Sequence, residues 1–225
     1  MLSAERPSRP RPVRYPLRPT AANHMAPIQT TPSDSDHLEH IWIITGPAGC
    51  GKTTVAQHLA KELSLPYVEG DDFHPIVNKQ KMASGIPLTD ADRWDWLITL
   101  REEALRHLRT SNGVIVTCSA LKHKYRDVIR VANYEHPSVQ VHFVYLKVDE
   151  GTLQRRVAAR VGHYMKESMV HSQMVALEEP EEDLEWDVLP VDVREDKESV
   201  KKHALDLVRR KLKEYEDLTG QLNGS

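Results

Sequence analysis

The residues best suited to chemistry form a glycine-rich run, GPAGCGKT, from Gly46 to Thr53. The run fits the pattern G-x-x-x-x-G-K-[ST] at every fixed position. Glycines let successive backbone N–H groups turn toward phosphate oxygens, the lysine reaches the β- and γ-phosphates, and the final hydroxyl can hold Mg²⁺. We therefore predict an ATP and Mg²⁺ site, with Lys52 supplying catalytic charge and Thr53 as the metal ligand, built from Gly46, Pro47, Ala48, Gly49, Cys50, Gly51, Lys52, Thr53 and Thr54.

A second polar cluster, GDDFHP at 70–75, follows a short apolar stretch at 66–69. Ligands of parallel sheets lie beyond the carboxyl ends of the strands, so this cluster is well placed to meet a phosphate. A carboxylate here could accept the proton of an attacking hydroxyl or orient Mg²⁺ through water. The alternative is a turn whose aspartates bond the local backbone. His74 taken alone fits a surface or helix-cap residue equally well.

Two basic clusters occur farther along the chain. In CSALKHKYR at 118–126, small residues permit close approach of a substrate, and Lys122 and Arg126 lie one helical turn apart, a spacing that suits a carboxylate. Arg156 and Arg160 share a helix face before a glycine-containing turn, as in a lid that brings guanidinium charge to a transferring phosphoryl group. For both pairs the alternative is an ordinary solvated helix face.

The elements that must position these residues alternate between strand-like and helix-like patterns. The predicted strands cover 41–44, 66–69, 114–118, 139–148 and 188–193. The predicted helices cover 54–63, 75–83, 89–108 (with Thr89 to Asp92 as cap and acidic first turn), 122–132, 149–160, 169–177 and 199–218. Such alternation is typical of a parallel sheet with crossover helices. We predict an α/β P-loop NTPase fold with a five-stranded parallel sheet, flanking helices and a lid, like a nucleoside-monophosphate kinase.

Length and charge limit the remaining functions. A chain of 225 residues supports one sizeable α/β domain, and we place it at 37–218, followed by a flexible C-terminus at 219–225. The net charge of −3, with acidic and basic residues mixed, argues against a duplex nucleic-acid partner. No apolar stretch approaches the length that spans a membrane. The two cysteines, Cys50 and Cys118, do not form a disulfide framework and fit a reducing compartment, so we expect a cytoplasmic location.

The segment 1–36 differs from the rest of the chain. It is rich in proline and arginine and lacks a hydrophobic period, so it cannot bury enough surface to offset the entropy of ordering it, and we predict disorder. Its arginines leave mitochondrial targeting open as an alternative. The prolines weaken that alternative because they interrupt any amphipathic helix.

Beyond the loop, longer motifs carry a resemblance to a known family. The chain resembles the gluconokinases of the small P-loop type, the thermoresistant gluconokinase family, from about Trp42 to Val193. The specific parts are the block N-x-x-K-M-x-x-G-x-P-L-x-D-x-D-R-x-x-W-L within 78–97 and C-S-A-L-K-x-x-Y-R at 118–126, supported by GDDFHP, by RVAARVGHYM at 156–165 and by LEEP at 177–180. Pro47, Ala48 and Cys50 depart from residues often seen in that family, at positions that the loop pattern leaves free.

The resemblance implies transfer of the γ-phosphoryl of ATP to the 6-hydroxyl of D-gluconate, within carbohydrate-acid metabolism that feeds the pentose phosphate pathway. It also makes a homodimer plausible. Asp71 matches the carboxylate of the family's G-D-x-x-H-P element and becomes the expected base, with Asp72 as the weaker candidate. The expected catalytic set is Lys52, Asp71, Arg156 and Arg160, and the expected substrate ligands are Asp71, His74, Arg93, Ser119, Lys122 and Arg126.

Two other functions remain open at this point. One is another small-metabolite kinase of the same fold, such as a shikimate or nucleoside-monophosphate kinase, which would need a different segment in place of 78–97. The other is a nucleotide-dependent switch without catalysis. The intact Lys52 and Thr53 and the acidic pair at 71–72 argue against the switch.

Overall fold

The computed structural model describes residues 38–158, 167–181 and 183–223, and they form a parallel five-stranded sheet with helices on both faces. The strand order is β2-β3-β1-β4-β5, and every neighbouring pair is parallel. The strands are β1 (Glu39–Thr45), β2 (Tyr67–Val68), β3 (Gly113–Thr117), β4 (Val139–Lys147) and β5 (Val188–Asp192). This sheet confirms the predicted P-loop NTPase fold.

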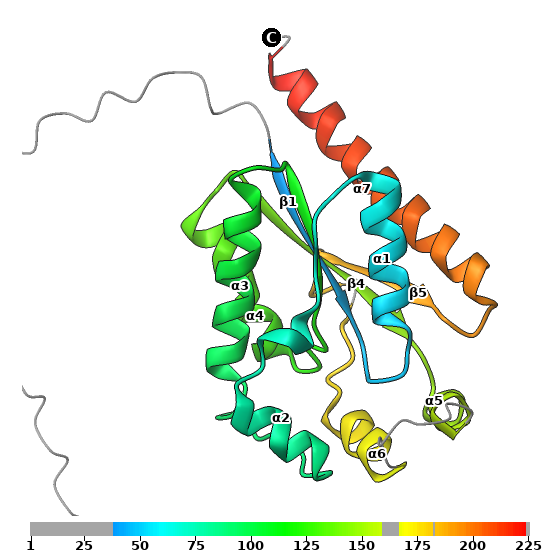
Figure 1. Cartoon of the computed structure of the whole chain (residues 1–225). Helices are drawn as coiled ribbons and strands as arrows, with labels where there is room; N and C mark the ends of the chain where they lie inside the picture. The colour runs from blue at the N-terminus through cyan, green and yellow to red at the C-terminus, as the bar shows by residue number, and fades with distance from the viewer. Residues whose placement is uncertain (1–37, 159–166, 182, 224–225) are drawn as a thin grey trace, which may run out of the picture. The chain divides into compact units, whose positions relative to one another are not determined.

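Alternation along β1 explains how the two faces are covered. Ile41 and Ile43 point into a core shared with α3 (Trp94–Leu108) and α4 (His123–Glu135). Trp42 and Ile44 point to the other face and pack with α1 (Lys52–Leu63) and α7 (Lys197–Asn223). Because successive side chains of a strand face opposite ways, a strand buried on both faces reads as a continuous apolar run. Figure 1 shows α1 and α7 on one side of the sheet and α3 and α4 on the other.

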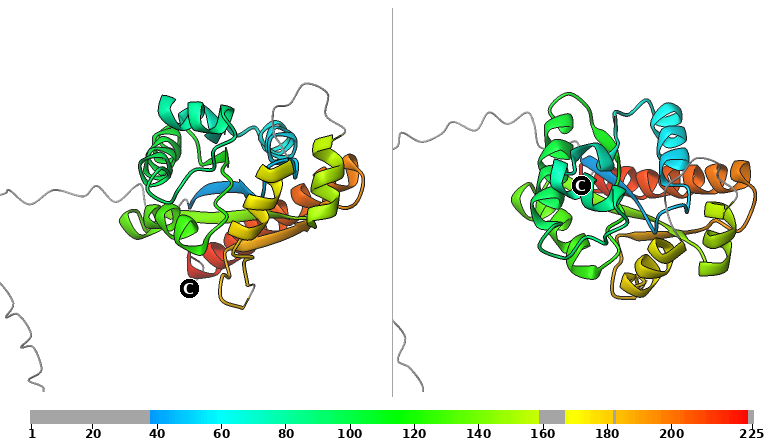
Figure 2. Two further views of the ribbon diagram at one scale, coloured as in Figure 1. Left: turned by 90° about the horizontal axis from the view of Figure 1, so that it is seen from below. Right: turned by 60° about the horizontal axis from the view of Figure 1, so that its bottom comes forward.

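The remaining elements gather at the carboxyl end of the sheet. They are the 3₁₀ turn η1 (Gly70–Phe73), α2 (Ile76–Ala83), α5 (Glu150–Ala158) and α6 (Glu167–Ala176). Figure 1 places α2, α5 and α6 beyond the end at which β1 runs into α1, and Figure 2 shows the same end from below. This is the end at which parallel sheets of this type bind their ligands.

Two predicted helix boundaries were wrong. The helix expected from Thr89 begins at Trp94, because residues 91–93 form a separate turn around which Thr89 and Asp92 exchange hydrogen bonds between side chains and backbone amides. The closing helix α7 continues to Asn223, past the predicted end at Leu218, and the flexibility expected from 219 stays a prediction.

Other predictions lie outside the part of the chain that the structure describes. These are the tail at 1–36, which stays a prediction of disorder, and Arg160 with the turn expected to form a lid. Within the described residues, none of the helices combines the length and the apolar character needed to cross a membrane.

Candidate active site

The phosphate loop connects β1 to α1 through three glycines with positive φ angles. They are Gly46 at 137°, Gly49 at 85° and Gly51 at 110°, a region of backbone conformation that side chains disfavour. A side chain at Gly46 would also come within 3.0 Å of the sulfur of Cys50. At the start of α1, the Lys52 ammonium folds back and donates to the carbonyl of Gly46 at 3.1 Å and of Pro47 at 3.2 Å. The loop therefore has the backbone that a phosphate cradle requires.

Two cavities border this loop on different sides. The α7 cavity, about 320 Å³, lies against Gly49, Cys50 and Gly51 and is closed by α7 and the segment before it. The α2 cavity, about 560 Å³, lies against Ala48 and Lys52 and is closed by η1, α2, α6 and the segments that precede α3 and follow β3. The expected substrate residues Asp71, His74, Arg93 and Ser119 all line the α2 cavity. The loop thus lies between the two cavities, with Gly49 to Gly51 on the α7 side and Ala48 and Lys52 on the α2 side.

Asp71 is presented by a tightly fixed turn. The Gly70 amide donates to the Thr117 hydroxyl at 2.9 Å, and the Gly70 carbonyl accepts from the Trp96 indole at 2.8 Å. A side chain at Gly70 would lie only 1.9 Å from the carbonyl oxygen of Thr117, so only glycine fits here. These contacts hold η1 against the end of β3 and direct Asp71 into the α2 cavity.

The surroundings of Asp71 raise the pKa of its carboxyl. Desolvation is the main cause; the charge of Lys52 opposes it, and the neighbouring carboxylates Glu69 and Asp72 add to it. The side chain is nevertheless 81% exposed and faces the open space of the α2 cavity. A carboxylate whose pKa lies closer to neutrality is a better proton acceptor for a hydroxyl.

His74 and Arg93 both line the α2 cavity, and each has one buried polar atom without a hydrogen-bond partner. His74 is buried, stacks on Trp96 with ring centroids 4.0 Å apart, and has no partner for Nδ1. Burial and the positive charges of Arg93 and Lys79 lower its pKa to about 4, so the ring is neutral at pH 7. The buried Nε of Arg93 also lacks a partner. Buried polar groups are ordinarily hydrogen-bonded, so these two atoms point to a polar ligand.

The segment between α2 and α3 holds Arg93 in place. The Asn78 amide donates to the carbonyl of Asp92 at 2.6 Å, and Lys81 pairs with the Asp92 carboxylate at 2.6 Å. Arg93 itself donates to the carbonyl of Leu88 at 3.3 Å. The Arg93 guanidinium lies 5.6 Å from the centre of the Tyr125 ring, which supports it from the other side. The sequence block at 78–97 is therefore the scaffold of one wall of the cavity.

Ser119 reaches the cavity because the end of β1 fixes the backbone after β3. The Thr45 hydroxyl donates to the Ser119 carbonyl at 2.6 Å, and the Gly46 amide donates to the same oxygen at 3.4 Å. Ser119 and Leu121 accordingly both line the α2 cavity.

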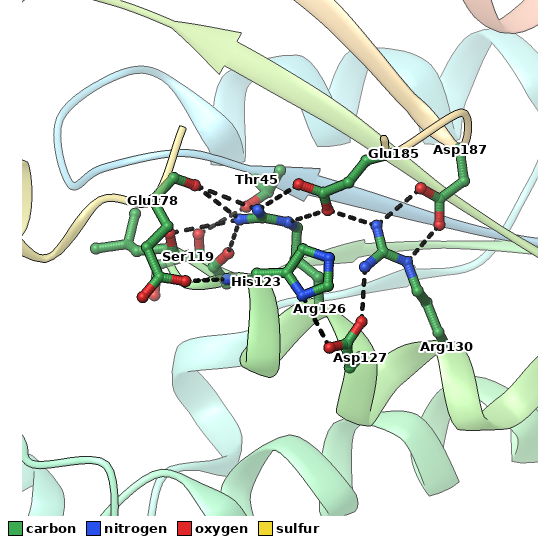
Figure 3. Close-up of polar contacts among 11 residues, drawn as sticks. Thr45, Ser119, His123, Arg126, Asp127, Arg130, Glu178, Glu185 and Asp187 are labelled. Carbon is green, nitrogen blue, oxygen red and sulfur yellow. Dashed lines mark hydrogen bonds and ion pairs between the residues drawn. The ribbon is translucent and has the colours of Figure 1, made fainter. Parts of the chain in front are cut away.

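Arg126 does not reach the cavity, which contradicts its expected role as a ligand of the substrate carboxylate. Its side chain is 1% exposed, and its guanidinium makes two hydrogen bonds of 2.7 and 2.6 Å to Glu185. It also donates to the carbonyls of Ala120 and Glu178. We call the group of Arg126, Arg130, Glu185 and Asp187 the α4 ion network, and Figure 3 shows it with every charge paired.

Lys122 is likewise engaged elsewhere. Its ammonium lies 2.9 Å from Oδ1 of Asp90, the oxygen that also accepts from the Tyr125 hydroxyl, and the second oxygen, Oδ2, accepts from Lys124. The hydrogen bond from Lys124 is the main reason that the pKa of Asp90 lies well below its usual range, and the bonds from Tyr125 and Lys122 add to the effect. Lys122 is absent from the described residues that line either cavity, so its role is to tie α4 to the segment before α3.

Arg156 lies on the other side of the loop. It donates to the carbonyls of Cys50, at 3.3 Å, and Val193, and it lines the α7 cavity. The structure therefore brings Arg156 to the loop, as expected of a residue that contacts the nucleotide. It does not bring Arg156 to the α2 cavity, where a charge on the acceptor side would be needed.

Comparison with known proteins agrees with this geometry. The family model described as an AAA domain matches residues 41–180. A probable gluconokinase of Schizosaccharomyces pombe is 41% identical over 178 residues, which cover 78% of this chain and 91% of that protein. The thermoresistant gluconokinase of Escherichia coli is 39% identical over 178 residues, covering 79% and 98%.

The chain belongs to the gluconokinase family. The crystal structure of a gluconokinase from Sinorhizobium meliloti agrees, with a TM-score of 0.69 and 35% identity over 80% of this chain and 98% of that one. Membership of the gluconokinase family makes the chain a kinase, with ATP as the nucleotide and a small molecule as the acceptor.

The structure adds Glu69, which the sequence did not single out. One of its carboxylate oxygens accepts from the Thr53 hydroxyl at 3.0 Å and from the Tyr67 hydroxyl, and the other accepts from Thr117. Burial alone would raise the pKa of Glu69, but these hydrogen bonds outweigh it and lower the pKa, so the group is a carboxylate at neutral pH. Its place at the end of β2, two residues before Asp71, is the sequence signal that could have found it.

Proposed function

We propose that this gluconokinase-family chain transfers the γ-phosphoryl group of ATP to the 6-hydroxyl of D-gluconate and releases 6-phospho-D-gluconate and ADP. The observation that carries the proposal is the α2 cavity, where a carboxylate, a guanidinium and the loop lysine line one space beside the phosphate loop. The relatives that match most of this chain are named gluconokinases. A carboxylate-bearing polyol fits a cavity with these charges.

The nucleotide would bind from the side of the α7 cavity. The loop amides from Gly46 to Thr54 would surround its phosphates, and Lys52 would neutralise the charge that develops on the β- and γ-phosphates. Arg156 would contact the nucleotide from α5. The catalytic role expected for Arg160 stays a proposal, because that residue lies outside the described part of the chain.

The side chains near the loop fit Mg²⁺. This ion prefers oxygen ligands and is commonly held by one or two protein groups together with substrate phosphates. Thr53 and the ionised Glu69 lie 3.0 Å apart at the start of α1 and offer such oxygens. When bound there, the ion would neutralise phosphate charge and help to align the transferring group.

Asp71 is the proposed base. It lines the cavity together with Lys52, and its raised pKa suits acceptance of the proton of the attacking 6-hydroxyl. Asp72 lines the same cavity and remains the weaker candidate. Since phosphoryl transfer asks the protein mainly for positioning and charge neutralisation, we expect Asp71 to orient the hydroxyl as well.

Recognition of gluconate is assigned to the cavity walls. Arg93, with its unpartnered Nε, would bind the carboxylate, and His74 and Ser119 would exchange hydrogen bonds with the hydroxyls. Arg126 and Lys122 are not included in this proposed set, because they pair with Glu185 and Asp90.

A coupled assay of ADP production tests the function directly. The purified chain is given ATP and Mg²⁺ with D-gluconate, shikimate, glucose or nucleoside monophosphates in parallel. We expect ADP to form at a high rate with gluconate alone, and mass spectrometry to show a phosphorylated gluconate. Preference for another acceptor would indicate a different small-metabolite kinase, and ADP release that no acceptor stimulates would indicate a switch.

The setting of the enzyme is also a proposal. Cys50 and Cys118 are both buried free thiols, which supports a reducing compartment such as the cytoplasm. Fractionation of cells that express a tagged full-length chain would separate this location from a mitochondrial one. A homodimer is proposed on the family resemblance, and light scattering of the purified chain would measure its mass.

A further inference from the structure

Helix α6 reaches the phosphate loop through the side chain of Gln173. Its amide oxygen, Oε1, accepts a hydrogen bond from the backbone N–H of Ala48 at 2.6 Å. Gln173 is half-buried and lines the α2 cavity together with Lys52 and Asp71. A single carboxamide therefore touches both the loop that would bind phosphate and the space that would hold the acceptor.

The contact between Gln173 and Ala48 matters because of the side of the loop on which Ala48 lies. Gly49, Cys50 and Gly51 border the α7 cavity, whereas Ala48 and Lys52 border the α2 cavity. A nucleotide that enters on the α7 side must present its terminal phosphate to the α2 side, where the acceptor lies. The N–H groups of such a loop bind phosphate oxygens. Gln173 thus occupies an N–H on the side of the loop that borders the α2 cavity.

We propose that Gln173 is a positioning residue that responds to the γ-phosphate. Its oxygen holds the Ala48 N–H in the nucleotide-free enzyme, and a γ-phosphate oxygen displaces it when ATP binds. A carboxamide carries two N–H donors beside its oxygen, so the displaced side chain can donate to the transferring phosphoryl group from the cavity that it already lines. The inference rests on ATP as the phosphoryl donor, not on the identity of the acceptor.

Competition for a single N–H predicts that a carboxylate at position 173 weakens ATP binding and that removal of the side chain does not. A carboxylate at position 173 would hold the Ala48 N–H more strongly than an amide oxygen and would repel the γ-phosphate. Removal of the side chain would free the N–H, so the loop would no longer have to break an internal bond before binding ATP. ADP has no γ-phosphate, so both substitutions should leave its dissociation constant almost unchanged.

The test measures the dissociation constants of a non-hydrolysable ATP analogue and of ADP by calorimetry, with Mg²⁺ and without an acceptor. For Gln173→Glu we expect analogue binding to weaken by about tenfold or more, as for a hydrogen bond to a charged group, and ADP binding to change by less than about twofold. For Gln173→Ala we expect the analogue to bind as tightly as in the wild type or up to about fivefold more tightly. Turnover with gluconate should nevertheless fall by roughly tenfold, since the donor is lost.

Gln57→Glu and Gln57→Ala, on the exposed face of α1, are the matched controls and should leave both constants unchanged. If Gln173 only anchors α6, both of its variants will weaken the analogue and ADP alike, and that result overturns the proposal. Unchanged analogue binding in Gln173→Glu overturns it too, provided that thermal melting shows an intact fold. Because no acceptor is present, this outcome is independent of whether gluconate is the substrate.

Discussion

The α2 cavity and the α4 ion network are built from the same kinds of side chain, arginine and lysine beside aspartate and glutamate. In the network, Arg126 and Arg130 donate hydrogen bonds of 2.6 to 2.8 Å to Glu185 and Asp187, and both carboxylates are buried. In the cavity, Arg93 keeps an unpartnered Nε, and Asp71 is largely exposed.

The difference in pairing separates a structural role from a functional one. A buried charge is held in place by its partner. Removing either partner leaves the other charge uncompensated in a low-dielectric interior, which destabilises the fold. A charge that faces a cavity without a partner contributes little to folding and is available to a ligand. Substitutions in the cavity should therefore change activity and spare stability, and those in the network should do the reverse.

The largest effect is expected from Lys52→Ala. The change removes the charge that follows the β- and γ-phosphates, so kcat with gluconate should fall by about 10³ or more. The Lys52 ammonium bonds only loop carbonyls in this structure, and the melting temperature should shift by no more than about 2 °C. Near-normal turnover of the variant would show that Lys52 is not needed for phosphoryl transfer.

Asp71→Asn should lower kcat by roughly 10² to 10⁴, the usual range for loss of a general base, while the dissociation constant of ATP changes little. Asp72→Asn is the matched control, with the same change of charge at the next residue, and should reduce kcat by less than about fivefold. Small and equal losses of kcat in both variants would indicate that neither aspartate is the base and that GDDFHP only forms a turn.

The pH profile of kcat gives a second view of Asp71. Its pKa is raised, so the carboxylate is fully present only above that raised value, and kcat should rise with pH through it. The midpoint of this acidic limb should therefore lie above 3.8, the ordinary value for aspartate. In Asp71→Asn the residual activity should lack that limb, whereas Asp72→Asn should retain it.

The network is tested by Arg126→Met. This variant leaves Glu185, which is 4% exposed, without its main partner, and the free energy of unfolding in urea should fall by about 3–5 kcal/mol. Adding Glu185→Leu should recover part of the loss, since Arg130 keeps Asp187. The Michaelis constants of the folded fraction should stay within about threefold of the wild type. A large rise in the gluconate constant without loss of stability would restore Arg126 to the substrate site.

The sequence predicted the fold well because its signals are local. Strand alternation, the GPAGCGKT loop and the glycine turns depend on neighbouring residues, and every predicted strand is present in the sheet. The boundary at Thr89 was missed because Asp92, predicted to lie in the first helical turn, instead accepts hydrogen bonds from Thr89 and Lys81.

The site was predicted less completely because partners lie far apart in the chain. Whether an arginine is available depends on what meets it in space, and Glu185 lies far along the chain from Arg126. The spacing of Arg126 and Lys122 in the sequence alone led to the prediction that they bind the substrate carboxylate. Gln173 was missed for the same reason: it contacts Ala48, which lies far from it in the sequence, and no local pattern connects the two segments.

The smallest effect, and the one that most sharpens the comparison, is expected from Arg93→Lys. The positive charge is kept, but the planar fork that can make two parallel bonds to a carboxylate is lost. The Michaelis constant for gluconate should rise by about tenfold, in line with about 1.5–3 kcal/mol for a hydrogen bond to a charged group, and that for ATP should hardly move. Stability should fall only slightly, since the contacts of the Arg93 guanidinium with the protein are a 3.3 Å hydrogen bond to the Leu88 carbonyl and the face of the Tyr125 ring. Arg109→Lys, at the exposed end of α3, is the matched control and should alter neither constant. A rise in the ATP constant with gluconate unaffected would place Arg93 on the nucleotide side, and the unpaired guanidinium would then no longer identify the substrate carboxylate site.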